Sequence, residues 1–182
     1  AGSNANVAIE VRGPRVEKVS YYKGVDPGKW MNGVSSFDTV VYKNLYNGVD
    51  ALFFCSHGKL KYEYRLIKGA SYKSIHPTYT GIDSLSIAPN GDLLVHIGEI
   101  CIGEEKPRVY QPTRNGVITR NASFVVNDQA HYEFSVSCVD PRYPLIIDPI
   151  YSTLLGGNKN ERVRDICVVN DSIVAVAISS LS

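Results

Sequence analysis

Short segments with the pattern of β-strands recur along the whole chain, and turn signals separate them. In residues 60–66, apolar and aromatic side chains alternate with charged ones, as in a strand with one buried face and one solvated face. Asn90-Gly91 lies between two further apolar runs and favours a tight hairpin, because both residue types tolerate positive φ. Helical signals are limited to single turns, one of which begins at Asp26-Pro27. We therefore predict an all-β fold: an antiparallel, β-sandwich-like domain with terminal strand extensions.

The composition argues against two classes of protein. The chain has 19 basic and 18 acidic residues, a net charge of +1 and no basic stripe, so we expect no nucleic-acid partner. No apolar run approaches the ~18 residues of a membrane-spanning helix, so we expect no membrane span. Hydrophobic residues make up 44% of 182 residues, which suits a folded domain with a sizeable core.

The distribution of these signals divides the chain into three parts. Residues 1–11 are predicted to form an N-terminal strand or tail, and residues 12–149 the sandwich-like domain. Residues 150–182 follow Asp148-Pro149 and contain two apolar runs separated by a polar turn, which predicts a β appendage of two or three strands.

The cysteines do not have the spacing of a metal or redox site. They lie far apart in the sequence and form no C-x-x-C pair. They fit either two disulfides in an oxidising compartment or four buried thiols. The four candidates are Cys55, Cys101, Cys138 and Cys167.

No motif predicts catalysis, a metal or another cofactor. Ser56 and Lys59 have the spacing of a nucleophile and its base, but they flank a predicted hairpin turn instead of sharing a helix face. The histidines (His57, His76, His96 and His131) form no metal-binding pattern, and Asp26, Asp38, Asp50, Asp140 and Asp148 lie where turn and capping residues are expected. We expect a protein that is not an enzyme and binds no cofactor.

Aromatic residues offer one candidate binding surface. Trp30, Tyr21, Tyr22, Tyr42 and Tyr46 could together form a platform on which a sugar stacks. Their alternating positions more often mark the core or a half-buried sheet face.

Six motifs, in this order, resemble a domain of unknown function in secreted bacterial and archaeal proteins, where it precedes seven-bladed β-propeller-type (SBBP) repeats. They are YYKGVDPGKW (21–30), VVYKNLYNGVD (40–50), LKYEY (60–64) followed by KGA (68–70), NGDL (90–93), KPRVYQ (106–111) and PLIIDP (144–149). YSTLLGG (151–157) resembles the opening of a first SBBP repeat. The resemblance implies an extracellular or cell-surface location and brings no catalytic residues. Two acceptor triplets for N-glycosylation, at Asn121 and Asn170, agree with that location.

The two ends suggest how copies of the chain could assemble. Members of the resembled family carry additional strands upstream of residues 7–11, so we expect an incomplete sheet here, and open sheet edges pair readily with other chains. Donated terminal strands would join subunits head to tail into a surface filament, a contact that does not close on itself. The candidate inter-subunit residues are Val7, Ile9, Val11, Ile173, Val174, Val176 and Ile178. The alternative is a monomeric cell-surface module that binds glycans or mediates adhesion.

Overall fold

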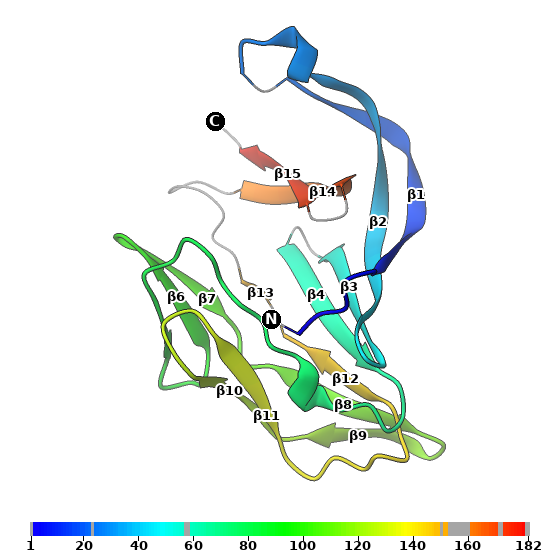
Figure 1. The fold of residues 1–182 in the computed structure, drawn as a ribbon, viewed down its shortest axis with the longest axis vertical. Helices are drawn as coiled ribbons and strands as arrows, with labels where there is room; N and C mark the ends of the chain where they lie inside the picture. The colour runs from blue at the N-terminus through cyan, green and yellow to red at the C-terminus, as the bar shows by residue number, and fades with distance from the viewer. Residues whose placement is uncertain are drawn as a thin grey trace.

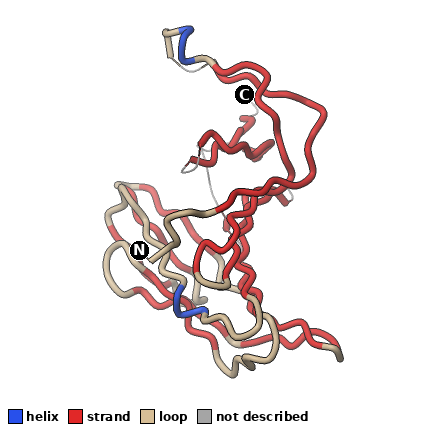
Figure 2. Tube along the Cα trace, turned by 45° about the vertical axis from the view of Figure 1, so that its right-hand side comes forward, coloured by secondary structure: helices blue, strands red, loops and turns tan. Residues whose placement is uncertain are grey.

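The computed structural model describes residues 2–22, 24–56, 59–149, 151–152, 161–170 and 173–180. For Lys59 and for residues 151–180, only the course of the strands is described. Within this part of the chain the fold is built of antiparallel β-strands and two single helical turns, which confirms the predicted all-β, sandwich-like class (Figures 1 and 2). No helix among the described residues has the length and apolar character of a membrane span.

The largest sheet has nine strands, ordered β15-β14-β2-β3-β4-β12-β8-β9, with β1 paired to β2 beside this path. Its strands are β1 (Ala8–Tyr21), β2 (Met31–Tyr46), β3 (Val49–Ser56), β4 (Lys59–Leu66), β8 (Arg108–Thr113), β9 (Gly116–Arg120), β12 (Leu145–Asp148), β14 (Glu161–Asn170) and β15 (Ile173–Ser180). The predicted hairpin at 56–59 is present, because Ser56 and Lys59 are paired at the end of β3 and β4.

Two smaller sheets pack beside the large one. The first contains β5 (Ser84–Ile87), β6 (Leu93–Ile97), β7 (Ile100–Glu104) and β13 (Tyr151–Ser152), and the second pairs β10 (Ala122–Val126) with β11 (Tyr132–Val136). The helical turns are η1 (Pro27–Lys29) and η2 (Tyr72–Ser74). Asp26 caps η1 as predicted, since its Oδ1 accepts from the Gly28 N–H at 3.0 Å.

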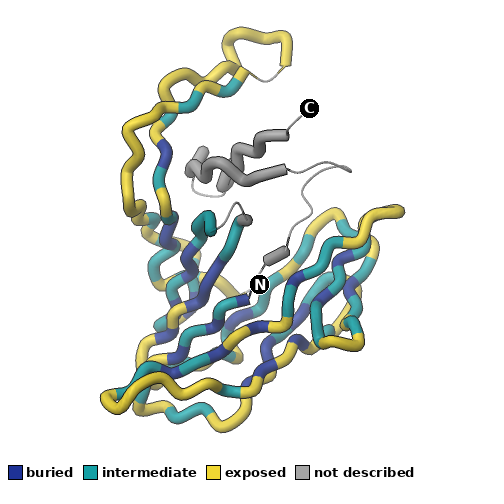
Figure 3. The backbone as a smooth tube through the Cα atoms, turned by 180° about the vertical axis from the view of Figure 1, so that it is seen from behind, coloured by how far each residue is buried: buried dark blue, intermediate teal, exposed yellow. Residues whose placement is uncertain are grey.

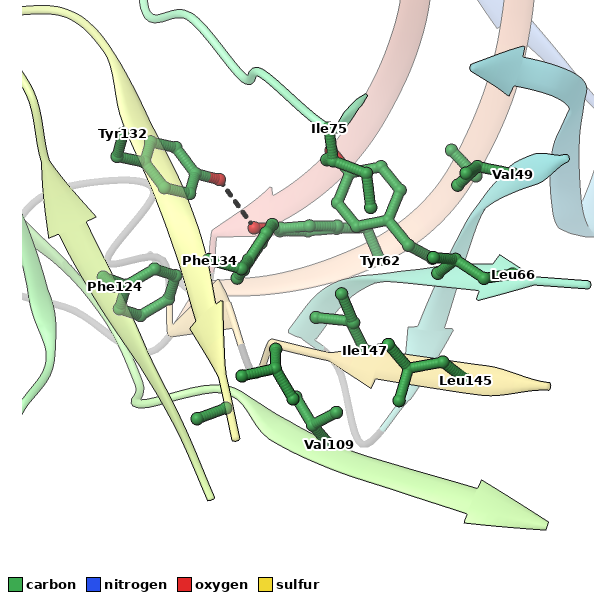
Figure 4. Packing of buried hydrophobic residues seen from close by; sticks show 14 of the residues in the cluster. Val49, Tyr62, Leu66, Ile75, Val109, Phe124, Tyr132, Phe134, Leu145 and Ile147 are labelled. Atoms are coloured by element: carbon green, nitrogen blue, oxygen red, sulfur yellow. Dashed lines mark hydrogen bonds between the residues drawn. The ribbon is translucent and has the colours of Figure 1, made fainter. Parts of the chain in front are cut away.

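The core lies between the middle of the large sheet and the two smaller ones (Figure 4). Ile147 and Val109 are fully buried on the inner face of the large sheet, and Phe134 projects toward them from β11. The Phe134 ring lies 5.9 Å from Tyr64 and 5.7 Å from Phe124, centroid to centroid. Aromatic and β-branched side chains on alternating positions thus form the contact between the layers.

Strands β1 and β2 extend beyond this body as a two-stranded ribbon, which curves away from it in Figure 1. Strand β3 pairs with β2 only from Thr39 onward. We call residues 12–38 the arm. Within the arm, β1 and β2 pair with each other. The further described partner is β14, which pairs with β2 at Phe37. Most of the arm is solvent-exposed (Figure 3).

The N-terminal strand differs from the strand or tail expected over residues 1–11, because β1 continues past the expected boundary at residue 12. Val7 precedes the strand, whereas Ile9 and Val11 belong to a strand that continues to Tyr21. Most of two apolar runs, residues 7–11 and 16–22, forms one strand across Gly13-Pro14. Gly13 adopts φ +63° and the register shifts after Pro14, so the strand continues past this apparent break. Ile9 lies opposite Tyr42 and Val11 opposite Val40, so β1 is already paired within its own chain.

The C-terminal candidates lie on β15, which pairs with β14. The side chains of Ile173, Val174, Val176 and Ile178 lie outside the described residues.

Candidate functional site

The tip of the arm presents an ordered aromatic pair. Trp30 donates from Nε1 to the Gly24 carbonyl at 3.2 Å, and its ring meets that of Tyr22 edge-on at 5.3 Å. Val25 beside them is 99% exposed, and Val16 farther along the arm is 94% exposed. Apolar side chains held this far into solvent gain nothing from burial within their own fold.

The charge of the arm is predominantly basic. Residues 12–38 contain five lysines and arginines against three acids, so the arm has a net charge of +2, whereas the whole chain has a net charge of +1. Arg15 is paired with Asp38 at 2.9 Å. Lys18 and Lys29 are exposed and form no ion pair with the described residues, so their charges are available to a partner.

The turn between β6 and β7 has the opposite character. Residues 74–105 contain five acids and no lysine or arginine. At this turn Asp83 and Glu99 are exposed beside Ile97 and Ile100, whose exposed fractions are 37% and 61%. Asp83 also fixes the turn, because its Oδ2 accepts from the Gly98 N–H at 2.5 Å. We call Asp83, Ile97, Glu99 and Ile100 the acidic turn.

A buried polar network joins all three sheets. Glu104 on β7 is fully buried and accepts from the hydroxyl of Tyr62 on β4 and, at 3.0 Å, from that of Tyr79. The Tyr62 hydroxyl also lies 2.9 Å from that of Tyr132 on β11. Burial raises the pKa of Glu104 to about 7, although the two phenol hydrogen bonds act against this rise. Because Glu104 itself is closed to solvent, we assign this network to stability.

A groove with a volume of about 420 Å³ lies beside β8, β9 and β12. Arg108, Tyr110, Thr119 and Asp148 are among the residues that line it. Asp148 is unlike the other candidate aspartates, because its Oδ1 is buried without a hydrogen-bond partner.

Of the other aspartates, Asp26 and Asp140 lie at turns as predicted, whereas Asp38 lies within β2 and Asp50 within β3. Asp50 pairs with Lys43 and accepts from the Asn44 N–H, and Asp140 binds Arg142. Each of the three described histidines contacts a side chain near it: His76 contacts Glu133, His96 contacts Ser86 and His131 contacts Asp128. The described residues contain no cluster of three potential metal ligands. His57 and the Lys59 side chain lie outside the described residues, so the Ser56–Lys59 pair stays untested.

The proposed aromatic platform does not assemble. Tyr22 and Trp30 lie at the tip of the arm, whereas Tyr42 packs against Phe53 in the body and Tyr46 is 6% exposed in the core. Tyr21 is half-buried on β1. Tyr42 and Tyr46, which lie at alternating positions of β2, therefore pack in the body and bury apolar area there.

The three cysteines whose side chains the structure describes form no disulfide. Cys101 on β7 and Cys138 after β11 are exposed free thiols, and Cys55 is half-buried. The alternative of four buried thiols fails as well, since two of them are exposed. Cys167 lies outside the described side chains. Of the two glycosylation triplets, Asn121 is exposed at the groove, and the Asn170 side chain lies outside the described residues.

Sequence reasoning missed Glu104 and the groove. Glu104 is followed by Glu105, and nothing local shows which acid turns inward. The groove is formed by strands far apart in the sequence, so only the pairing of β12 with β8 brings its residues together.

The match to known families covers most of the chain. Residues 1–150 match a family model described as a domain of unknown function (DUF7948). No curated protein and no solved structure matches the chain. The chain is therefore a member of this family of unknown function.

Proposed function

We propose that this protein is a structural subunit of an extracellular filament, in which the arm of one copy binds the acidic turn of the next. The observation that carries the proposal is the complementarity of these two surfaces. Lys18 and Lys29 on the arm are exposed and form no ion pair within the described part of the chain. Asp83 and Glu99 face solvent, and residues 74–105 contain no lysine or arginine. Complementary charge steers association and fixes register.

Both surfaces also offer apolar area. Val16 and Val25 are almost fully exposed on the arm, and Ile100 is 61% exposed at the acidic turn. Removing such side chains from water supplies affinity, whereas the charges supply orientation.

The placement of the two surfaces favours an open chain of subunits. Figure 1 shows the arm and the β6–β7 hairpin on different sides of the molecule. A contact between two different surfaces repeats from copy to copy and forms a fibre when the rotation does not close. This proposal keeps the head-to-tail filament expected from the sequence. It replaces donation of a free strand with docking of the arm, because β1 is already paired with β2.

The extracellular location is part of the proposal. Its support is the resemblance to secreted proteins with SBBP repeats and the two Asn-x-Ser triplets, of which Asn121 is exposed.

Charge reversal tests the contact. We expect the mass measured by light scattering to rise with protein concentration and to fall with added salt. Lys18→Glu with Lys29→Glu should leave a monomer, and so should Glu99→Lys. Lys73→Glu, an exposed lysine of the body, is the matched control and should assemble normally.

Mixing the two reversed variants gives the decisive result. Each reversed surface then faces an opposite charge, so filaments should return only in the mixture. A protein that stays monomeric at every concentration would contradict the proposal and favour the second candidate, a monomeric surface module.

A further inference from the structure

Strand β9 forms one edge of the large sheet. It ends the strand order, and among the described strands it pairs with β8 alone (Figure 1). Residues 116–119 are all exposed, and the exposed fractions of Val117 and Ile118, on opposite faces of the strand, are 65% and 43%. An edge strand that carries exposed apolar side chains pairs readily with a further strand.

The outer edge of β1 is protected against such pairing, whereas the edge of β9 is not. Strand β1 contains five charged residues, Pro14 and two shifts of register, and proteins use these features to prevent pairing at an edge. Between its two end residues, β9 contains only Val117, Ile118 and Thr119, which favour extended backbone, and its register is regular. The edge of β9 is therefore suited to accept a strand.

The register shows which backbone groups of β9 face outward. In an antiparallel pair, residue pairs that exchange both backbone hydrogen bonds alternate with pairs that exchange none. Pro112 has no N–H, so its pair with Val117 is of the second kind, and so is the pair of Tyr110 with Thr119 two residues away. The N–H and C=O groups of Val117 and Thr119 therefore point away from β8, toward the place of an added strand.

The groove beside β8, β9 and β12 adjoins this edge and is basic. The two outward-facing residues of β9 line it together with Lys106, Arg108 and Arg120, and the half-buried Asp148 is the one acid of its described lining. Lys106 and Arg108 are exposed and form no ion pair within the described part of the chain. A strand with acidic side chains matches this surface, whereas a second copy of β9 would bring two basic surfaces together.

We infer that β9 binds an extended, acidic segment of another protein, which adds a strand to the large sheet. Backbone hydrogen bonds to Val117 and Thr119 supply affinity, and carboxylates that meet Lys106 and Arg108 supply specificity. Every described strand of this chain is already paired within it, so the segment belongs to a different protein. Strand β9 lies outside the arm and the acidic turn, so this binding does not depend on filament assembly.

Fluorescence anisotropy with a labelled probe tests the site on the full chain. The probe is a short peptide in which glutamate alternates with valine or threonine, so that its carboxylates share one face. We expect the parent to bind it. Thr119→Pro removes one outward N–H without breaking the pairing with β8, and it should weaken binding about tenfold. Thr119→Val keeps that N–H and is the matched control, which should bind like the parent.

A second pair of variants tests the charges. Lys106→Gln together with Arg108→Gln should weaken binding by about tenfold or more. Lys68→Gln is the control, because Lys68 is exposed and lies outside the groove, the arm and the acidic turn. It should leave the affinity for the probe unchanged.

Several results would overturn the inference. They are the absence of binding at millimolar probe, equal affinity for a probe with glutamine in place of glutamate, and unchanged binding by a Thr119→Pro variant that melts like the parent. If Thr119→Pro does not fold, two probes methylated on the odd or on the even amide nitrogens replace it, and undiminished binding of both contradicts strand addition. Self-association of the chain that Thr119→Pro abolishes would assign this edge to a second copy instead.

Discussion

The body and the arm are built from the same kind of antiparallel strands, yet they differ in what their side chains meet. In the body, Ile147 and Val109 are fully buried between two layers. In the arm, Val16 is 94% exposed on a two-stranded ribbon. Strand pairing alone stabilises a hairpin only marginally, and a second layer supplies most of the free energy. The body thus buries its apolar side chains within one chain, and the exposed side chains of the arm are the basis for the proposed docking on another copy.

The largest difference should appear when an apolar side chain is removed from each region. Phe134→Ala should lower the free energy of unfolding by about 3–5 kcal/mol, because Phe134 is 5% exposed and contacts several rings. Val16→Ala should change it by no more than about 0.5 kcal/mol. Chemical denaturation of dilute monomer measures both, and equal losses would remove the distinction between the regions.

The pH dependence of stability sharpens the comparison inside the body. Glu104 has a folded-state pKa of about 7, above the ordinary value of 4.5, so the folded state holds its proton more tightly than the unfolded chain. The contribution of Glu104 to stability should therefore be largest below about pH 4.5 and fall as the pH rises toward 7, by roughly 3 kcal/mol in total. The Glu104→Gln variant should not show this loss. The difference in unfolding free energy between the parent and the variant, measured at each pH, gives the contribution of Glu104. A difference that does not change with pH would show that Glu104 is not a buried, titrating acid.

Two glycines with positive φ give a smaller contrast. A Cβ on Gly48 (φ +73°) would lie 2.9 Å from the Ala70 Cβ, whereas a Cβ on Gly24 (φ +77°) at the tip of the arm would meet nothing within 4 Å. Gly48→Ala should cost about 2–4 kcal/mol, the sum of backbone strain and overpacking, and Gly24→Ala only about 1 kcal/mol. Thermal unfolding of both variants checks the order, which would be reversed if the arm were the more tightly packed region.

A small effect on stability is also expected at the aromatic pair of the tip. Trp30→Ala removes one hydrogen bond and one ring contact from a residue that is 39% exposed, so the monomer should lose no more than about 1 kcal/mol. Assembly should weaken more than folding does. Light scattering and denaturation of the same variant separate the two, and a fully unfolded variant would mean that the tip supports the body.

Local patterns predicted the elements of the fold, and pairing between distant segments decided the rest. Alternation in residues 60–66 correctly identified β4, and Asp26-Pro27 correctly marked a capped turn. The arm was not predicted, because Gly13-Pro14 resembles a break and only pairing with β2 shows that the strand continues. The groove is likewise invisible in sequence, since Asp148 and Arg108 are 40 residues apart and meet only through β12 and β8. The sequence shows the negative charge of the acidic turn, but the exposure of its side chains follows from tertiary packing.

Hydrogen exchange as a function of protein concentration tests the central claim most directly. If the arm docks on the next copy, amides of residues 12–22 and 97–100 should gain protection together as concentration rises, while core strands such as β11 stay unchanged. Salt should reverse the gain, because the contact depends on exposed charges. Protection of both segments that is the same at every concentration would show that the arm has no partner among copies of this chain.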